Sequence, residues 1–199
     1  MIAIIDVTGN NLTSLANAVG RLGYDYKLTH DARDIQQASH VILPGVGAAP
    51  SGMQALHQHH LIDVLTQLKQ PLLGICLGMQ LLLEYSEEGK TRCLGLIPGQ
   101  AELIRHDVNY PIPHMGWNQV QWCNNSPLKK GLNEQSYLYF VHSYALNNPE
   151  HALALCHYNE PFSAIINKNN IYGMQFHPEK SAETGMILLK NFLSLETLC

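Results

Sequence analysis

The chain has 199 residues, of which 46% are apolar, and this predicts one domain with a sizeable core and no need for disulfides. Its net charge of −4 and its 12 scattered lysines and arginines exclude a protein that binds nucleic acid through a basic face. Five cysteines, an odd number without a C-x-x-C pair, exclude a disulfide framework and a zinc knuckle and are typical of reduced thiols in the cytoplasm.

The first predicted elements alternate between strand and helix. Residues 2–6 form a short apolar strand without a basic leader, and no run is long enough to span a membrane, so we expect a cytoplasmic protein without a membrane segment. Asn11 is predicted to cap a helix whose apolar residues fall on one face and which Gly23 ends. Residues 24–29 then alternate as a second strand.

The alternation of strand and helix continues into the middle of the chain. The segment "HVILPGVG" predicts a third strand that Pro44 ends, and apolar residues between 53 and 68 predict a helical stretch. The "HQHH" cluster at 57–60 indicates an exposed helix face rather than a metal site. A continuously apolar strand follows at 71–75. These repeated units predict an α/β fold with a doubly wound, largely parallel sheet and helices on both faces.

After Gly89 the sequence becomes richer in strands. Strand-like runs separated by Gly, Pro and Asn turns occur at 94–105, 117–122, 136–144, 151–158, 162–167 and 171–176. A last amphipathic helix is predicted over about 184–195. Because no repeat, low-complexity tract or linker separates the two halves, we expect a single domain over residues 1–199.

Cys76 lies where an apolar strand gives way to helical spacing, within "GICLG". Gly74 and Gly78 flank it as in a nucleophile elbow, where a sharp strand-to-helix turn lifts the middle side chain above the sheet edge. Side chains at the flanking positions would collide there, and glycine has none. The positive end of the following helix would stabilise a thiolate. The alternative, an inert core cysteine, stays open on this segment alone.

A nucleophilic thiol needs a base, and the base needs an orienting group. The segment "MQFHPEK" offers both after a predicted strand. Pro178 favours an extended backbone at His177, which directs the side chains of residues 177 and 179 to the same side. Glu179 can then hold the imidazole of His177.

An acyl-transfer site also needs backbone N–H donors for an oxyanion. The turn after Pro44 contains Gly45, Val46 and Gly47, which can present such donors, and the elbow itself places the N–H of Leu77. Taken alone, the same segment fits an ordinary Gly-Pro turn better.

Several motifs together resemble those of a known family. "LPGVG", "GICLGMQ" and "FHPEKS" look like the oxyanion strand, nucleophile elbow and His-Pro-Glu element of the triad glutamine amidotransferases, in the same order and at similar separation. "PHMGWN" and "YFVHSY" narrow the resemblance to the glutaminase subunits of imidazole glycerol phosphate synthases, which serve histidine biosynthesis. This similarity extends over nearly the whole chain.

The resemblance implies a reaction and a partner. Cys76 would be the nucleophile, His177 the base and acid, and Glu179 the orienting group in the hydrolysis of glutamine to glutamate and ammonia. The ammonia would pass to a cyclase subunit, in a heterodimer, that makes imidazole glycerol phosphate and AICAR. We expect no cofactor and no metal.

The resemblance also implies which residues hold glutamine: Gln80, Glu88 and backbone groups of Ser143 and Tyr144. One segment departs from the family pattern. The turn "DVTGNNL" stands where relatives carry a glycine-rich turn followed by Asn-Leu, and Asn11 fills the asparagine position.

Three other functions stay open. An amidotransferase serving anthranilate or a purine would carry the same triad, although "PGVG" and "HMGWN" favour the histidine pathway. A non-catalytic binding subunit could use the fold as a scaffold, and the complete triad argues against it. A cysteine hydrolase of peptides or esters would share the chemistry, but no segment outlines a peptide cleft.

The position of the site predicts where a partner docks. Cys76 and His177 each follow a strand directly, so both are expected at the carboxyl edge of the sheet, where open α/β sheets form their crevice. Ammonia released at a rim that faced water would escape, so the partner should cover that rim. We expect Asn11, Trp117 and Lys180 at the contact, with Trp117 as the main anchor. For Asn11 a helix cap is an equal alternative.

Overall fold

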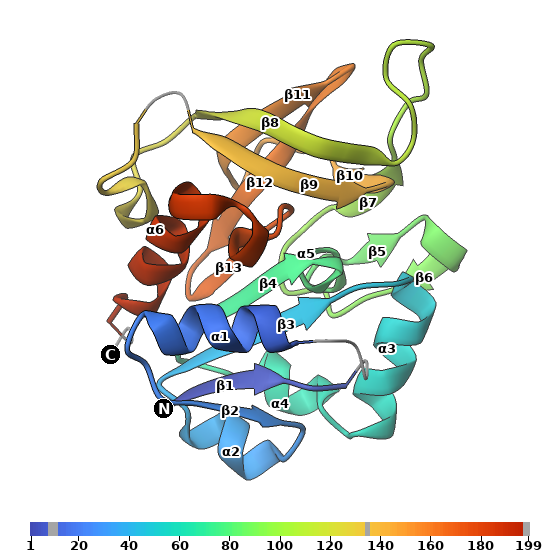
Figure 1. Ribbon diagram of the computed structural model, residues 1–199. Coiled ribbons are helices and arrows are strands. Elements are labelled where there is room, and N and C mark those ends of the chain that lie inside the picture. The colour runs from blue at the N-terminus through green and yellow to red at the C-terminus, as the bar shows by residue number, and fades with distance from the viewer. Residues whose placement is uncertain (8–11, 134–135, 197–199) are drawn as a thin grey trace.

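A nine-stranded sheet forms the centre of the computed structural model, which describes residues 1–7, 12–133 and 136–196 (Figure 1). The N-terminal half contains, in chain order, β1 (Ile2–Ile5), α1 (Thr13–Arg21), β2 (Tyr26–Thr29), α2 (Ala32–Gln37), β3 (His40–Gly45), α3 (Ala49–Gln58), α4 (Ile62–Thr66), β4 (Leu72–Cys76) and α5 (Leu77–Leu81).

Strands dominate the second half, together with three short 3₁₀ helices (η). Its elements are β5 (Tyr85–Ser86), η1 (Glu88–Lys90), β6 (Thr91–Arg92), β7 (Gln100–Leu103), β8 (His114–Trp122), η2 (Pro127–Lys129), β9 (Tyr137–His142), β10 (Tyr144–Leu146), β11 (Ala152–Tyr158), β12 (Glu160–Lys168), β13 (Ile171–Met174), η3 (Pro178–Lys180) and α6 (Ala182–Leu193). The expected strand-rich half and final helix are confirmed.

The large sheet is parallel on one side and antiparallel on the other. Its order is β2-β1-β3-β4-β13-β12-β11-β8-β9, and the strands from β2 to β13 run parallel. From β13 to β9 every neighbouring pair is antiparallel. The predicted α/β fold is therefore confirmed, with a mixed sheet whose parallel order ends at β13. A second sheet, β10-β7-β5-β6, was not predicted, because two of its strands have only two residues each.

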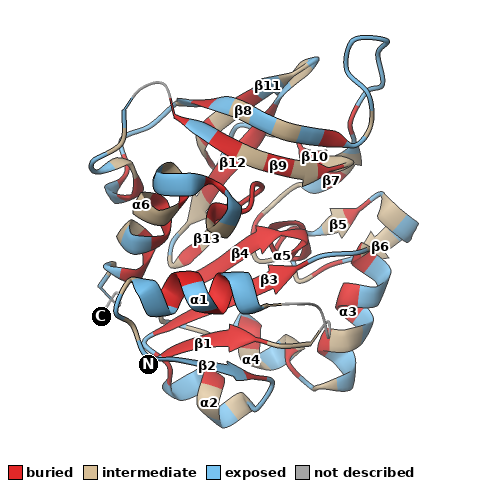
Figure 2. Ribbon diagram, in the orientation of Figure 1, coloured by how far each residue is buried: buried red, intermediate tan, exposed pale blue. Residues whose placement is uncertain are grey.

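Alternating residues of the central strands pack on opposite faces, which places a core on each side of the sheet. In β1, Ile2 and Ile4 belong to the core beneath α1 and α6, whereas Ala3 and Ile5 belong to the core beneath α2, α3 and α4. Strands that are buried on both faces read as continuous apolar runs, as expected for the parallel part of such a sheet. Figure 2 shows β3, β4 and α5 as buried almost throughout.

Four predictions about local structure were wrong or incomplete. Pro44 does not end β3, which continues to Gly45. The pairing of β3 with β1 stops at Ile42, so Pro44, which has no N–H, interrupts no hydrogen bond between these two strands. The helix α2 was missed, although Asp31 caps it by accepting a hydrogen bond of 2.7 Å from the N–H of Arg33.

The other two concern helix ends. The stretch from 53 to 68 is two helices, because α3 ends in a Schellman motif with His60 at φ 56° and the N–H of Leu61 donating to the carbonyl of Leu56. The N-cap position of α1 is Leu12 rather than Asn11, and Asn11 lies outside the described residues.

The predicted strand-to-helix turn at Cys76 is present and tight. Cys76 ends β4 with φ 54° and ψ −113°, an uncommon conformation for a residue with a side chain, and α5 begins at the next residue. A Cβ on Gly74 would lie 2.6 Å from the carbonyl oxygen of Gly78, and a Cβ on Gly78 would overlap the carbonyl oxygen of Leu43. The two glycines are therefore needed for α5 to lie against β3 and β4.

We predict that Gly78→Ala destabilises the fold by about 3 kcal/mol or more, because the added methyl group meets backbone that cannot move without separating α5 from β3. Urea unfolding followed by circular dichroism measures the effect. Gly20→Ala in α1 is the matched control, since its Cβ would have an ordinary contact of 3.4 Å with Tyr26 and alanine favours a helix. Equal stability of the two variants would contradict this account of the elbow.

Candidate active site

The carboxyl ends of the central parallel strands meet at one edge of the sheet. Cys76 is the last residue of β4 and pairs with Gly45 of β3, while His177 follows β13, the neighbour of β4 on the other side. A cavity of about 370 Å³ opens at this edge, with these residues on its walls: Val46, Gly47, Cys76, Leu77, Gln80, Glu88, Pro113, Val141, His142, Ser143, Tyr144 and His177. The structure thus brings most of the predicted site residues together.

His177 and Glu179 form a buried ion pair behind the cavity. Nδ1 of His177 lies 2.9 Å from Oε1 of Glu179, and the two side chains are 5% and 9% exposed. The route to this pairing differs from the expected one. Residues 178–180 form a 3₁₀ turn instead of an extended segment, and only His177 keeps an extended backbone. The contact fixes the tautomer, because a carboxylate accepts and Nδ1–H must donate.

A serine that sequence reasoning missed holds this histidine in place. Oγ of Ser181, which is fully buried, donates to the carbonyl of His177 at 2.6 Å and accepts from the N–H of Tyr139 at 2.9 Å. The N–H of His177 in turn donates to the carbonyl of Tyr139 at 3.0 Å. Ser181 and β9 therefore fix the backbone of the histidine. Its place directly after "HPEK" was the available signal.

The electrostatics of His177 favour the imidazolium. Burial alone would lower the pKa of His177, but the interactions with the Cys76 thiol and the Glu179 carboxylate outweigh burial and raise its pKa to about 9. Its Nε2 is buried and has no hydrogen-bond partner within the described part of the chain. With its pKa raised in this way, the neutral imidazole is a base strong enough to take a proton from a neighbouring thiol and to keep it as the imidazolium.

The oxyanion candidates divide into two groups. Val46, Gly47 and Leu77 line the cavity, and Leu77 is the first residue of α5, where a helix leaves its N–H groups without intrahelical acceptors. Gly45 is not on the cavity wall. It packs against the start of α5, where a Cβ would lie 2.9 Å from the nitrogen of Gly78. Gly45 thus allows a close approach of backbone, and its role as an oxyanion donor stays a prediction.

The predicted substrate-binding groups are already partly engaged. Nε2 of Gln80 donates to the carbonyl of Tyr144 at 2.8 Å, and the carbonyl of Ser143 accepts from the N–H of Ile104 at 2.9 Å. One carboxylate oxygen of Glu88 accepts from the N–H of Ala49 at 2.8 Å, at the start of α3. The backbone carbonyls of residues 143 and 144 therefore both accept hydrogen bonds within the protein.

The residues predicted to contact a partner lie near the triad but outside the cavity. A second hollow of about 300 Å³ shares His177 with the cavity and includes Leu12, Glu179 and Lys180. Trp117 is 53% exposed on β8 and pairs with Tyr139 of β9, the residue whose backbone holds His177. Asn11 lies outside the described residues, next to Leu12.

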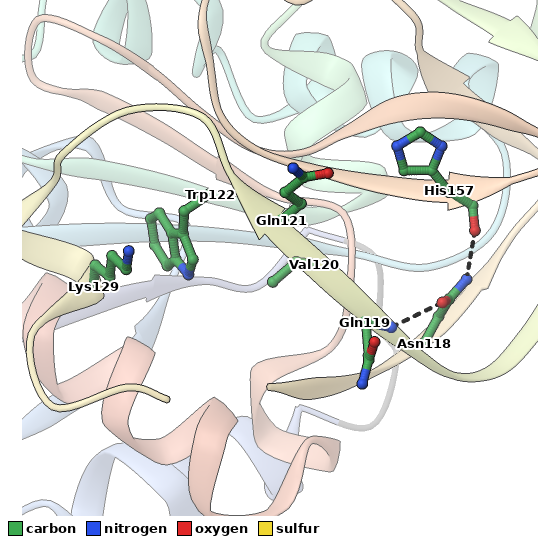
Figure 3. A pocket seen from close by; sticks show the side chains of 7 residues that line it. All are labelled: Asn118, Gln119, Val120, Gln121, Trp122, Lys129 and His157. Atoms are coloured by element: carbon green, nitrogen blue, oxygen red, sulfur yellow. Dashed lines mark hydrogen bonds between the residues drawn. The ribbon is translucent and has the colours of Figure 1, made fainter. Parts of the chain in front are cut away.

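Another hollow, of about 590 Å³, lies away from the triad (Figure 3). Its walls are Asn118, Gln119, Val120, Gln121, Trp122, Lys129 and His157. These side chains include neither a thiol nor a carboxylate, and Asn118 is occupied in donating to the carbonyl of His157 at 3.0 Å. The reacting groups are gathered in the smaller cavity.

Two searches of the described residues were negative. No group of three or more histidine, cysteine, aspartate or glutamate side chains there has the arrangement of a metal site. None of the helices in the described ranges has the length and apolar character that crossing a membrane requires. The histidines at 57–60 lie at the end of α3 and the turn after it, and most of them are exposed.

Comparisons with known proteins cover the whole chain. Residues 3–195 match the family model "Glutamine amidotransferase class-I". "Imidazole glycerol phosphate synthase subunit HisH 2" of Legionella pneumophila (strain Lens) is 66% identical over 199 residues, which are 100% of both chains. "Imidazole glycerol phosphate synthase subunit HisH" of Haemophilus influenzae is 49% identical over 192 residues, 96% of each chain.

Solved structures show the same fold at low identity. A structure titled "Crystal structure of glutamine amidotransferase" has a TM-score of 0.73 and 16% identity, covering 96% of each chain. The glutaminase domain of Trypanosoma brucei CTPS with bound acivicin has a TM-score of 0.64 and 13% identity, covering 99% of this chain and 95% of that one.

Two further histidines are buried beside the cavity. Nδ1 of His114 lies 3.1 Å from Nε2 of His142, and Nδ1 of His142 lies 3.0 Å from the carbonyl of Tyr144. Burial lowers the pKa of His114 to about 4, and burial together with the charges of His114 and His177 lowers that of His142 to about 3. Both rings are neutral in the folded protein near pH 7.

We predict that the fold loses stability as the pH falls from about 6.5 towards 4. In that range the unfolded chain protonates these histidines while the folded chain does not, so acid favours unfolding. From pH 7 to 5, His114→Phe should lose about 2 kcal/mol less stability than the parent, given the folded pKa of about 4. Urea unfolding at both pH values measures this. His157→Phe, at an exposed histidine, should keep the parental pH dependence, and the same dependence in His114→Phe would contradict the prediction.

Proposed function

The chain belongs to the class-I glutamine amidotransferases, and on that premise we propose that it is the glutaminase subunit of an imidazole glycerol phosphate synthase in histidine biosynthesis. The observation that carries this proposal is the pairing of Cys76 and His177 on the wall of one cavity, with Glu179 bonded to His177, in a chain 66% identical to such a subunit. A role in histidine biosynthesis also supports a cytoplasmic location.

In the proposed reaction, Cys76 gives its proton to Nε2 of His177, and the thiolate attacks the side-chain carbonyl carbon of glutamine. Glu179 holds the ring through Nδ1–H and stabilises the imidazolium. His177 then protonates the leaving nitrogen, which departs as ammonia and leaves a γ-glutamyl thioester on Cys76. A water molecule, deprotonated by His177, attacks the thioester and releases glutamate. No step requires a metal or a cofactor.

The oxyanion formed in both steps needs N–H donors at the cavity wall. Leu77 supports this role because its N–H begins α5 next to the nucleophile. Val46 and Gly47 form the opposite lip, and Gly47 has φ 100°, a conformation open to glycine. We assign these three residues to the oxyanion site.

Glutamine fits the cavity by size and by charge. A volume of about 370 Å³ is at the small end of the range for ligand sites, as suits an amino acid. Glu88 offers a carboxylate to the substrate ammonium, and the backbone at Ser143 and Tyr144 offers N–H groups, since both carbonyls are engaged. Gln80 lies between them with its side-chain oxygen available.

The partner would be the cyclase subunit, docked over the edge that holds the triad. Exposed apolar side chains lie on this part of β8 and β9, where Met115 is 63% and Trp117 and Tyr137 are each 53% exposed. The second hollow, which includes Lys180, adjoins the triad at His177 and Glu179. Covering the edge would keep ammonia from water and carry it to the acceptor in a heterodimer.

A glutaminase of the anthranilate or purine pathway would have the same triad, but identities of 13% and 16% to other solved amidotransferases support the fold alone. A non-catalytic binding subunit does not account for a buried His–Glu pair beside a thiol.

We predict that Cys76→Ala abolishes glutamine hydrolysis, with a loss of several orders of magnitude, while the fold is retained because only one sulfur atom is removed. Glutamate release is measured with the cyclase subunit and its ribonucleotide ligand present. Cys123→Ala, at an exposed cysteine, is the matched control and should stay active. With ammonium in place of glutamine the Cys76→Ala complex should still form product. Glutamine turnover near the parental rate would remove Cys76 from the reaction.

We predict that Trp117→Ala weakens subunit association by about 2 kcal/mol or more, because exposed tryptophans are frequent interface anchors. Lys180→Ala should weaken association or uncouple glutamine consumption from product formation. Titration against the cyclase subunit measures both effects. Tyr26→Ala on the opposite edge strand β2 and Lys190→Ala on α6 are the controls. Parental affinity and one-to-one coupling in both test variants would exclude this docking face.

A further inference from the structure

Gln175 is a fully buried polar residue beside the nucleophile, and the reaction described above does not use it. It follows the last paired residue of β13, Met174, whose partner in β4 is Ile75, so Gln175 comes level with Cys76. Its side chain has no exposed surface, and its Nε2 lies 3.9 Å from Sγ of Cys76. A buried amide needs partners for its N–H groups and its oxygen, so its orientation is under strong constraint.

A backbone carbonyl fixes which end of this amide faces the sulfur. The carbonyl of Tyr144 can only accept, so the group of Gln80 that lies 2.8 Å from it must be the NH₂ group. The same nitrogen lies 3.1 Å from the amide oxygen of Gln175 and donates its other hydrogen there. Gln175 therefore presents its own NH₂ group to Cys76.

The imidazole pair supports the same carbonyl from the other side. Nδ1–H of His142 donates to the carbonyl of Tyr144 at 3.0 Å, which leaves Nε2 of His142 to accept from Nδ1–H of His114 at 3.1 Å. Turning either glutamine amide over would place two donors or two acceptors face to face in a buried site, which is costly. The carbonyl of Tyr144 thus determines the donor and the acceptor in each hydrogen bond of this network.

We propose that Gln175 is a further catalytic residue, which donates a hydrogen bond to the sulfur of Cys76 and stabilises the thiolate. The neutral thiol has a different partner, because its S–H donates to the carbonyl of Val141 at 3.7 Å. When the proton moves to His177, the sulfur gains charge and the bond from Gln175 strengthens. The proposal rests on the function proposed above in taking Cys76 as the nucleophile.

The same geometry assigns a second task to Gln80. Both of its N–H hydrogens are committed, one to Tyr144 and one to Gln175, so only its oxygen can contact a substrate. Gln80 is then the residue that orients Gln175 while accepting a hydrogen bond from the bound amino acid.

The test follows thiolate formation directly. In a Cys123→Ser, Cys199→Ser background, Cys76 is alkylated with iodoacetamide from pH 6 to 10, and the modified peptide is quantified by mass spectrometry. Cys93 and Cys156 remain, but burial raises their pKa values to about 11 and 12, so both should react slowly. The variants are Gln175→Met, which keeps the length of the side chain, and Gln175→Leu. Gln121→Leu, at an exposed glutamine of β8, is the control.

We predict that both Gln175 variants move the midpoint of the alkylation profile up by about one pH unit and slow alkylation near pH 7 about tenfold, with a parental rate at the high-pH plateau. The other titratable groups on the cavity wall, His142, Tyr144, Glu88 and His177, are the same in every variant, so a difference in midpoint reports on residue 175. The Gln121→Leu profile should equal that of the parent.

A parental midpoint in either folded variant would overturn the proposal, and circular dichroism and thermal unfolding identify the folded ones. Gln175→Met keeps a weak acceptor for Gln80, so it carries the test where Gln175→Leu does not fold. Alkylation uses no glutamine, which separates this result from the proposed function. An active Cys76→Ala variant would contradict the proposed reaction, whereas an unchanged alkylation profile would contradict only the proposed role of Gln175.

Discussion

The close contact between α5 and the two strands β3 and β4 is the constraint on which the site depends. Gly74 and Gly78 let backbone meet backbone there, and Cys76 between them adopts φ 54° because the chain must leave the strand and enter the helix at once. The sulfur is thereby held at the sheet edge by covalent geometry and packing together. Everything else in the cavity is arranged around a nucleophile that has little freedom to move, which is the condition for short reaction distances.

The parallel and antiparallel halves of the large sheet both contribute to the cavity. The parallel strands supply Cys76 and the segment with His177, whereas β9 and β10 supply the opposite wall. Tyr139 of β9 fixes the histidine backbone, together with Ser181. A change of strand direction at β13 is therefore functional as well as architectural. It places residues that are far apart in the sequence on two sides of one cavity, and it pairs Trp117 of β8 with Tyr139, whose carbonyl accepts from the N–H of His177.

The sequence predicted the parts of the site that are determined locally. Glycines on both sides of a cysteine at a strand end indicate an elbow by themselves, and a His-Pro-Glu segment after a strand indicates a base and its partner. Gln175, Ser181 and the His114–His142 pair were not found, because their roles come from contacts between elements far apart in the sequence, which no local pattern encodes. Gly45 illustrates a related limit of local patterns, since a glycine can offer an N–H or make room for a helix, and only the tertiary structure shows that Gly45 packs against α5.

Charge in the cavity is controlled as carefully as position. Two imidazoles line its wall, and a thiolate pairs cleanly with one cation only if the other ring stays neutral. His142 donates to the carbonyl of Tyr144, a contact that favours its cation, but burial and the charges of His114 and His177 outweigh this and lower its pKa to about 3. The lone pair that a second proton would need accepts from His114. The positive charge is therefore confined to His177, where the carboxylate of Glu179 stabilises it. The ring of His142 cannot compete for the proton of Cys76.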